Sequence, residues 1–505
     1  MMKSADPVEA TALPETYHPV HQYEMFEVVV HGPASGNPWL EQNIRASFRF
    51  GHRTVDVNGF YDGGGVYKVR WMPDTPGLWT FNLSCSFQPT PQQSAFECLP
   101  MRAGVHGPVG VARRHHFAHA DGTPYFPFGT TCYAWTHQGE ALEQQTLATL
   151  KVSPFNKVRM CVFPKSYEYN SNEPEFYPFA RPAGTPLQSA GDTTRFDPVF
   201  WAHLERLIAD LQALGIQADL ILFHPYDRWG FASMSAADDD RYVRYAVARL
   251  ASFSNVWWSL ANEFDLMKSK TTQDFTRLLH LVQSEDPSEH LRSIHYSRTM
   301  YDYASPAVTH ASMQTAAFED APQWLESWEK PIVFDEVMYE GNLDRRWGNL
   351  SGEEMLRRVW LGVMAGCYVT HGETYFAPGD VIWWAKGGLL AGSSAPRIGF
   401  LRHLLQAAAP HGLEAATNAY YLHATTADKP PSAAGPRAIL HYFDFHQPLE
   451  YEVPLGAGVY RAAQIDPWAM TSTLLPGTYT GKARVPLTGR PGQALLLTWS
   501  HRKGA

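Results

Sequence analysis

The feature that most constrains the fold is an alternation of short apolar segments with helical patterns between about residues 115 and 410. Apolar residues from Trp201 to Leu214 recur every three or four positions, as on one face of a helix, and Gly215 follows as a stop signal. Ser351 and Glu354 have the spacing of a capping box, so another helix is predicted to begin there. Eight strand–helix units over this length are typical of a (β/α)8 barrel, which takes about 250 residues. The eight segments that we predict as strands are Phe126–Tyr133, Lys157–Phe163, Ala218–Phe223, Val256–Leu260, Arg292–His295, Val308–Ser312, Ile332–Phe334 and Gly366–Thr370.

The sequence on both sides of this region is typical of β-structure. Phe26–Val30, Ile44–Phe50 and Tyr67–Trp71 alternate with period two, and turns rich in Gly and Pro separate them. Segments after residue 413, such as Ile439–Phe443 and Ala494–Trp499, are strand-like as well. We therefore predict an α/β chain, a (β/α)8 TIM barrel flanked by an N-terminal β-sandwich and a C-terminal β-sandwich. The predicted boundaries are a leader over 1–22, the first sandwich over 23–108, the barrel over 109–412 and the second sandwich over 413–505.

The charge and hydropathy of the chain argue against several kinds of partner. The net charge is −9 and the isoelectric point is near 6.2, which disfavours nucleic acid and anionic membranes, because both require basic patches. No run of about 18 apolar residues is present, so no membrane span is predicted. The polar stretch from Met1 to Glu27 lacks the apolar core of a signal peptide, which favours a cytoplasmic protein. The oligomeric state stays open, and a homo-oligomer is one of the alternatives.

The sequence offers no cofactor motif. The five cysteines are scattered and form no C-x-x-C pair, and the run from His115 to His119 does not have the spacing of a chelating site. Phosphate-binding and serine-hydrolase motifs are absent as well. We therefore predict no cofactor and no metal site.

Two glutamates directly follow predicted barrel strands. Glu263 follows the fourth strand in the sequence Asn262-Glu263, and Glu336 follows the seventh. The catalytic groups of such barrels lie at the C-terminal ends of the strands, so both carboxylates are expected to face one cleft. Glycoside hydrolysis needs two such groups, one protonated to donate to the leaving oxygen and one ionised to attack the anomeric carbon. A lone Glu would more simply cap a strand or pair with an arginine, but two acids at these positions favour a catalytic pair.

The pair resembles that of clan A of the glycoside hydrolases, a group of retaining (β/α)8 enzymes. The resemblance implies that Glu263 is the acid/base, that Glu336 is the nucleophile and that Asn262 bonds the sugar 2-hydroxyl. Arg159 matches an arginine on strand two beside the nucleophile, where its charge would keep Glu336 ionised. His224 matches a histidine at the end of strand three, and the resemblance places it among the residues that bind the substrate.

A second resemblance rests on four short stretches, Gly59–Gly63, Ala120–Pro124, Thr370–Tyr375 and Trp383–Gly388. Through them the whole chain is similar to a bacterial three-part family with an N-terminal β-sandwich, an apiosidase-like clan A barrel and a small C-terminal β domain. The similarity implies a glycosidase with a carbohydrate substrate, without implying apiose as the sugar.

Further residues near the strand ends are candidates for contact with the sugar. Aromatic residues make up 13% of the chain, and sugar rings stack on aromatic side chains. Trp383 and Trp384 follow the eighth strand, and we expect one of them to stack on the sugar, with core packing as the alternative. Glu373 is predicted to bond a substrate hydroxyl or to pair structurally, and Tyr296 to orient the nucleophile or to be buried. Asp335 points away from the nucleophile side by strand alternation, so we expect it to pair with a helix or a backbone amide.

These features together predict a retaining glycoside hydrolase that acts on chain ends. The connection from Pro164 to Pro198 is long and rich in aromatic residues, which is typical of a functional loop. With Asp344–Gly348, it is expected to close one end of the cleft and favour exo action on short oligosaccharides or glycosides. The alternative is a loop packed on the N-terminal sandwich beside an open groove. Two other functions stay open, a transglycosylase or anhydro-sugar-forming enzyme with the same double displacement, and a non-catalytic glycan-binding protein.

Overall fold

The computed structural model describes residues 12–416, 422–427 and 435–500. The chain divides into two compact units, and it passes from one to the other several times. The first unit comprises Met1–Val109, Thr136–Gly139 and Cys161–Thr299, and the second comprises Gly110–Trp135, Glu140–Met160 and Met300–Ala505.

Eight parallel strands form one sheet that nearly closes into a barrel, which confirms the predicted fold class. Their spatial order is β18, β17, β16, β13, β12, β22, β20, β19. Strands β13, β16 and β17 are buried along their whole length, as expected where helices cover one face and packed side chains the other. The bounds are β12 Gly129–Thr131, β13 Lys157–Cys161, β16 Gln217–Phe223, β17 Val256–Ala261, β18 Arg292–Ser293, β19 Ala311–Gln314, β20 Ile332–Glu336 and β22 Tyr368–His371.

The helices between these strands begin and end at local sequence signals. The side chain of Asp197 caps α3, and Gly215 follows the helix with a positive φ of 71°, as its sequence pattern predicts. The predicted capping box of α7 is only half formed, because Ser351 caps the Glu354 amide whereas the Glu354 carboxylate pairs with Arg358. No helix in the described ranges combines the length and apolar character that a membrane span requires. The longer helices are α2 Glu140–Val152, α3 Pro198–Ala213, α4 Ala236–Leu250, α5 Thr272–Glu285, α6 Ala321–Trp328, α7 Gly352–Met364 and α9 Ser394–Ala408.

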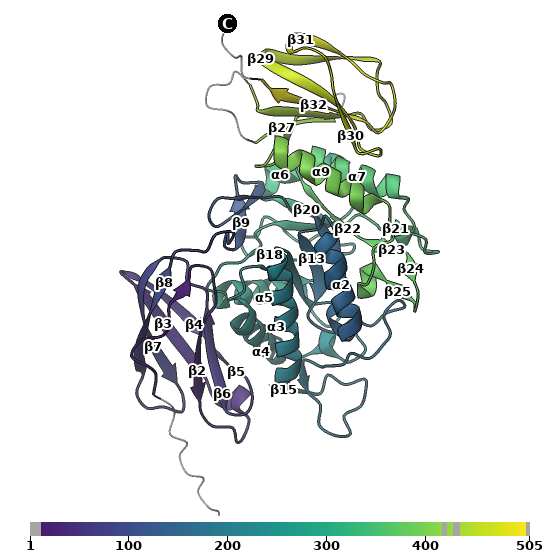
Figure 1. Ribbon diagram of the computed structural model, residues 1–505. Helices are drawn as coiled ribbons and strands as arrows, with labels where there is room; N and C mark the ends of the chain where they lie inside the picture. The colour runs from purple at the N-terminus through teal and green to yellow at the C-terminus, as the bar shows by residue number, and fades with distance from the viewer. Residues whose placement is uncertain (1–11, 417–421, 428–434, 501–505) are drawn as a thin grey trace, which may run out of the picture. The chain divides into compact units, whose positions relative to one another are not determined.

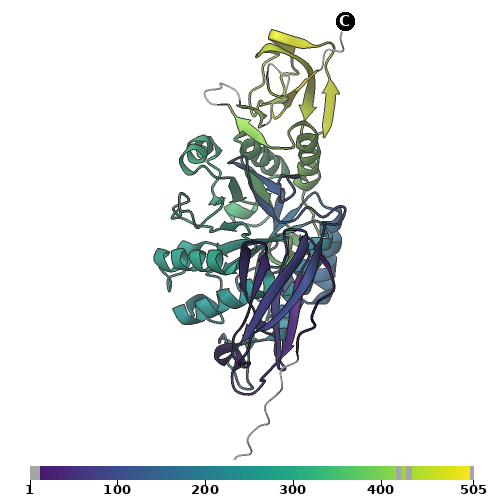
Figure 2. The same cartoon turned by 90° about the vertical axis from the view of Figure 1, so that its left-hand side faces the viewer.

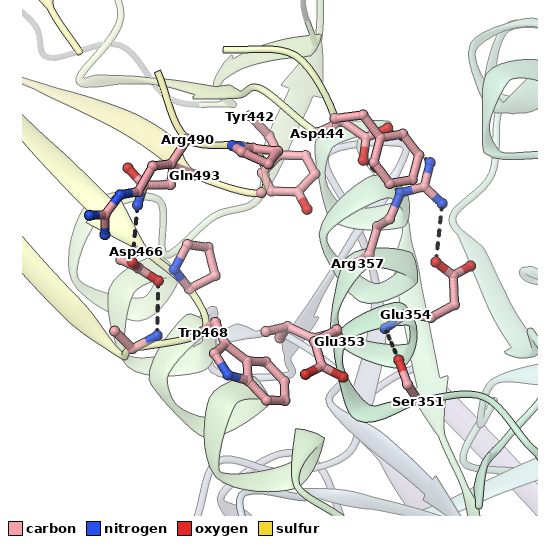
Figure 3. A pocket seen from close by; sticks show the side chains of 16 residues that line it. Ser351, Glu353, Glu354, Arg357, Tyr442, Asp444, Asp466, Trp468, Arg490 and Gln493 are labelled. Atoms are coloured by element: carbon pink, nitrogen blue, oxygen red, sulfur yellow. Dashed lines mark hydrogen bonds and ion pairs between the residues drawn. The ribbon is translucent and has the colours of Figure 1, made fainter. Parts of the chain in front are cut away.

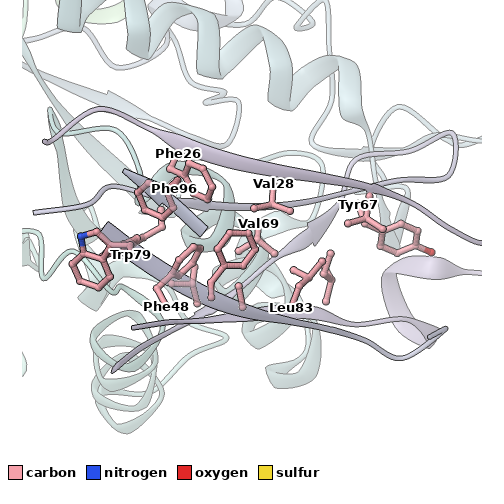
Figure 4. Packing of buried hydrophobic residues seen from close by; sticks show 14 of the residues in the cluster. Phe26, Val28, Phe48, Tyr67, Val69, Trp79, Leu83 and Phe96 are labelled. Atoms are coloured by element: carbon pink, nitrogen blue, oxygen red, sulfur yellow. The ribbon is translucent and has the colours of Figure 1, made fainter. Parts of the chain in front are cut away.

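The N-terminal strands form a β-sandwich within the first unit (Figure 1; Figure 2). Buried side chains from both sheets share one core, in which the rings of Phe26 and Phe96 stack at 3.9 Å (Figure 4). The predicted leader contributes β1, which pairs with β8, so its last residues belong to the sandwich. One sheet has the order β1 Val20–His21, β8 Gln92–Leu99, β7 Gly77–Cys85, β3 Ile44–Phe50, β4 Arg53–Asn58, and the other β2 Phe26–His31, β6 Val66–Trp71, β5 Phe60–Tyr61.

A nearly buried network of charges joins this sandwich to α3 and α4 in the same unit. The carboxylate of Glu205 on α3 accepts hydrogen bonds from Arg70 of the sandwich and from Arg249 on α4, each at 2.6 Å. Asp62 pairs with Arg249 at 2.5 Å, and Glu27 pairs with Arg70 at 2.6 Å. Each buried guanidinium therefore meets two carboxylates, which offsets the cost of removing it from water.

The C-terminal strands form one sheet within the second unit. A long strand, β29 (Glu450–Asp466), folds this sheet over on itself. Strand β29 pairs with β31 through its first part and with β32 through its second part. Val453 and Val485 from one part share a core with Ala462 and Leu497 from the other. The sheet thus has the two packed layers of a sandwich. The other bounds are β26 Leu413–Ala415, β27 Leu422–Thr426, β28 Ala438–Tyr442, β30 Thr471–Leu474, β31 Tyr479–Pro486 and β32 Ala494–Trp499.

Candidate active site

Glu336 is the last residue of β20 in the second unit, and it is half-buried. Its carboxylate accepts a hydrogen bond from the hydroxyl of Tyr133, a residue that follows β12 and is 1% exposed. Burial and the charge of Glu336 raise the pKa of Tyr133 well above its ordinary value. The hydroxyl therefore stays protonated at neutral pH, and it holds one carboxylate oxygen in place as a permanent donor.

Asp335, the neighbour of Glu336, points into a fully buried polar cluster. It accepts hydrogen bonds from Lys157 at 3.0 Å, Ser312 at 2.6 Å and Thr370 at 2.7 Å, and Arg159 lies 3.8 Å away. Burial alone would raise the pKa of Asp335, but the two cations and the hydroxyl donors outweigh it and lower the pKa well below its usual range. The predicted helix or backbone partner is therefore wrong, because the side chains of neighbouring barrel strands fill that place. Arg159 is thus an ionic partner of Asp335.

A cluster of aromatic side chains lies beside Glu336. The ring of Trp384 is 5.6 Å from that of Tyr133, 5.4 Å from Tyr339 and 4.9 Å from Trp347. Burial, and secondarily the charge of the nearby Glu336, raises the pKa of Tyr339 as well. Of the two predicted tryptophans, Trp384 thus belongs to the surroundings of the nucleophile candidate.

Trp383 and Glu373 have contacts that favour the structural alternatives left open by the sequence. Trp383 is 1% exposed, and its indole N–H donates to Thr130 Oγ1 at 2.9 Å. Glu373 is also 1% exposed, and its carboxylate accepts the backbone N–H groups of Ala391 and Gly392 at 2.5 and 2.9 Å.

Glu263 lies just beyond β17 in the first unit and has a strained backbone. Its φ of 49° and ψ of 52° are left-handed, a conformation that residues other than glycine adopt rarely and often at functional sites. The hydroxyl of Tyr226 donates to its carboxylate, and Asn262 Nδ2 is 3.5 Å from Oε2. Its backbone N–H is 3.4 Å from Nδ1 of His295. The strain and these contacts fix the direction of the buried carboxylate.

His224 and Tyr296, two predicted contacts of the sugar, are also buried in the first unit. Burial, and secondarily the charge of Lys165, lowers the pKa of His224 to about 3. Its Nε2 therefore donates as a neutral ring to the carbonyl of Phe163 at 3.1 Å. The ammonium of Lys165 lies 4.4 Å from the ring centroid of Tyr226, and so supports the tyrosine that binds the acid/base candidate.

The long connection after β13 is not structureless. It contains an antiparallel pair, β14 (Phe179–Ala180) and β15 (Asp192–Phe196). Its second half packs on the N-terminal sandwich, because Arg195 donates to the carbonyl of Gly36 at 2.8 Å and Asn37 donates to Thr194 at 2.9 Å. In its first half, the ring of Tyr167 lies 5.8 Å from that of Tyr226. The contact that the sequence offered as the alternative is thus present in part of the loop.

A separate cavity of about 480 Å³ lies within the second unit, between the start of α7 and the C-terminal sheet (Figure 3). Several of its polar side chains bind one another. Arg357 pairs with Asp444 at 2.6 Å, and Asp466 accepts a hydrogen bond from Gln493 at 3.0 Å. None of the predicted catalytic residues lines it.

The nearly closed barrel of parallel strands carries Glu263 just beyond the fourth strand and Glu336 at the end of the seventh. The chain belongs to the apiosidase-like catalytic domain family, whose model matches residues 112–396. Two domains of unknown function match the flanks, DUF5060 over residues 19–86 and DUF5605 over 428–498. The three-part resemblance found in the sequence is confirmed.

Solved structures agree with this assignment. A crystal structure of a candidate glycoside hydrolase from Bacteroides vulgatus is 38% identical, with a TM-score of 0.89 over 96% of this chain and 100% of its own. Another glycoside hydrolase structure is 13% identical, with a TM-score of 0.58 over 78% of this chain and 97% of its own, and it supports the fold alone. Among curated proteins, no sequence match is found. Family and fold together support a glycosidase.

Sequence reasoning missed the tyrosines that bind the two acids. Tyr133 falls at the end of a predicted strand, and Tyr226 follows His224 and Pro225. Their positions at strand ends were the available signal, but tyrosine is common in barrel cores and carries no motif there.

Proposed function

We propose that this protein is a retaining glycosidase in which Glu336 is the nucleophile and Glu263 the general acid/base. The observation that carries the proposal is the matched surroundings of the two acids. Each ends or follows a barrel strand, and each accepts a hydrogen bond from a tyrosine hydroxyl, Tyr133 for Glu336 and Tyr226 for Glu263. The membership of the apiosidase-like family supports the same chemistry.

The reaction proceeds in two displacements. In the first, an oxygen of Glu336 forms a bond to the anomeric carbon while the glycosidic C–O bond breaks, and the proton of Glu263 passes to the leaving oxygen. In the second, Glu263 takes a proton from water, the water oxygen attacks the anomeric carbon, and Glu336 leaves as a carboxylate. No cofactor is required.

The remaining polar groups bind and orient the sugar in this proposal. Asn262 bonds the 2-hydroxyl, His224 and Tyr296 line the site on the side of Glu263, and Trp384 offers an aromatic face beside Glu336. Arg159 supports the nucleophile by charge and through its pairing with Asp335. Glu373 and Trp383 take the structural roles that their contacts favour.

The nucleophile assignment is tested by covalent trapping. A panel of fluorinated aryl glycosides, pyranose and furanose, is expected to label Glu336 alone, because only the nucleophile forms a stable ester when the second step is slowed. Intact mass and peptide mapping give the site. A label on Asp335 or Glu373 would overturn the assignment.

The acid/base assignment is tested by Glu263→Ala. General acid catalysis contributes about 10²–10⁴-fold, so the variant should lose that much on poor leaving groups and much less on activated aryl glycosides. Azide should restore its rate and give a glycosyl azide of retained configuration. Equal losses on both substrates without rescue would contradict the role.

The stereochemistry is a third test. A retaining pair requires carboxyl groups about 5–5.5 Å apart, whereas inversion requires about 6.5–9.5 Å. Proton NMR of the anomer formed first, together with a crystal structure of the enzyme with a sugar, measures both quantities. Inverted product would refute the double displacement.

We further propose exo action on short oligosaccharides or glycosides in the cytoplasm. The first half of the 164–198 loop, where Tyr167 approaches Tyr226, supports a closed end of the cleft. Product analysis over time should detect one terminal unit released at each step. Early fragments from the middle of a long polymer would instead support the open groove, and transfer to an added alcohol in place of water would support a transglycosylase.

A further inference from the structure

Three buried side chains of the second unit converge just outside the parallel strands. They are Glu340 in β21 (Glu340–Gly341), His371 at the end of β22 and Glu373 in β23 (Glu373–Thr374). Strands β21 and β23 run parallel with Glu340 opposite Glu373, so the fold itself brings the two acids together. One ligand atom from each residue lies within 4.8 Å of the other two, and no side chain of the three is more than 1% exposed.

The histidine has a nitrogen without a partner that faces the acids. Its Nε2 is buried, forms no hydrogen bond and lies 3.9 Å from Glu373 Oε2. Its Nδ1 lies 3.1 Å from Thr130 Oγ1, and its ring stacks on Phe155 at 4.6 Å. When Nδ1 donates its proton to the threonine, the Nε2 lone pair is left free, which is the usual arrangement of a histidine that binds a metal.

Both acids are surrounded by hydrogen-bond donors. Glu340 accepts from the backbone N–H and hydroxyl groups of Ser393 and Ser394 at the start of α9. Glu373 accepts from the N–H groups of Ala391 and Gly392. These donors hold the carboxylate oxygens in fixed positions. Within the described part of the chain, neither acid pairs with Lys or Arg, so two adjacent buried carboxyl groups have no cationic side chain beside them.

The two carboxylates pack closely against a glycine. A Cβ atom added to Gly392 would lie 2.5 Å from Glu373 Oε2 and 2.6 Å from Glu340 Oε2. Those distances are far below van der Waals contact, so only glycine lets both oxygens approach the backbone at this position.

We propose that Glu340, His371 and Glu373 bind one divalent transition-metal ion, Zn²⁺ or Mn²⁺. One imidazole and two carboxylates suit these ions, whereas Ca²⁺ and Mg²⁺ prefer oxygen ligands alone. Bond lengths of about 2.0–2.2 Å require the ligand atoms to close in slightly around the ion. The ion is structural, because it is enclosed and ties the segments after β20 and β22 to the start of α9.

The test is metal binding by the whole chain, and it does not depend on glycosidase activity. Protein stripped with EDTA is titrated with ZnCl₂ or MnCl₂ by calorimetry, and Co²⁺ serves as a spectroscopic probe. The expected result is one ion per chain, a visible Co²⁺ absorption and a higher melting temperature with the ion. His371→Gln should weaken binding roughly 100-fold or more, since even the loss of an outer-shell partner of a metal ligand costs about 10–100-fold.

The matched control is His441→Gln. His441 is another buried histidine of the second unit, on β28, with no hydrogen-bond partner at either ring nitrogen. It should leave metal binding unchanged. Gly392→Ala provides a second variant, which keeps all three ligands but displaces both carboxylates, and it should also abolish binding. The proposal is overturned if the wild-type chain binds neither ion at one equivalent, or if His371→Gln binds as tightly as the control.

Discussion

Replacing either tyrosine beside the acids by phenylalanine should move one limb of the pH profile and leave the other in place. A donated hydrogen bond favours the ionised form of a carboxylate. Tyr226→Phe removes such a bond from Glu263, which must be protonated when the glycosidic bond breaks, so the basic limb of kcat/KM should move to higher pH. Tyr133→Phe removes the bond from Glu336, which must be ionised, so the acidic limb should move to higher pH.

The size of each shift follows from the bond that is lost. A hydrogen bond to a charged group contributes about 1.5–3 kcal/mol, and about 1.36 kcal/mol corresponds to one pH unit. Each limb should therefore move by about 1–2 pH units. The assay is kcat/KM for an aryl glycoside from pH 4 to 10, since its limbs report the essential groups of the free enzyme.

The two variants control each other. Both remove one phenolic oxygen, so a general loss of stability should lower kcat/KM in both variants alike. It would not move the basic limb in one variant and the acidic limb in the other. A shift of the acidic limb by Tyr226→Phe would mean that the roles of the two acids are exchanged. Unmoved limbs in both variants would refute the reasoning that these hydroxyls set the ionisation of the pair.

Two other predictions concern stability. Glu205→Gln should lower the free energy of unfolding by about 3 kcal/mol, because two charge-assisted hydrogen bonds in a nearly buried site are lost. Glu27→Gln should lower it by only about 1 kcal/mol, because its partner Arg70 keeps its contact with Glu205. Equal losses of the two variants in urea unfolding would contradict this. Burial lowers the pKa of His441 to about 3, so its contribution to stability is present above about pH 6.5 and is lost as the pH falls. His441→Phe should therefore lose about 2 kcal/mol less stability than the wild type between pH 7 and pH 5, and parallel pH curves for the two proteins would contradict this.

The barrel could be predicted because its signals are local. The apolar run of each strand and the stripe from Trp201 to Leu214 depend on neighbouring residues alone, and the structure confirms these elements. Glu263 and Glu336 could be placed at strand ends for the same reason. The capping box at Ser351 was only partly predicted, because the carboxylate of Glu354 pairs with the guanidinium of Arg358 and not with the backbone of Ser351.

Contacts between distant segments could not be predicted. Tyr133 and Glu336 are joined only because β12 and β20 flank the same strand, β22. The local sequence predicts a helix or a backbone amide as the partner of Asp335, because its cationic neighbour Lys157 comes from another strand. The cluster around His371 could not be predicted either. The spacing of Glu340, His371 and Glu373 in the sequence matches no chelating motif, and the backbone N–H groups that bind the two acids come from residues 391–394.

The charge network around Glu205 bears on how this architecture can evolve. Arg70 and Asp62 come from the domain that matches DUF5060, whereas Glu205 and Arg249 come from the apiosidase-like domain. Exchange of the sandwich for an unrelated one would take Arg70 from Glu205 and Asp62 from Arg249, and these two helix residues would keep only each other. Recombination at this junction is therefore constrained, and the two domains are expected to be inherited as a single evolutionary unit.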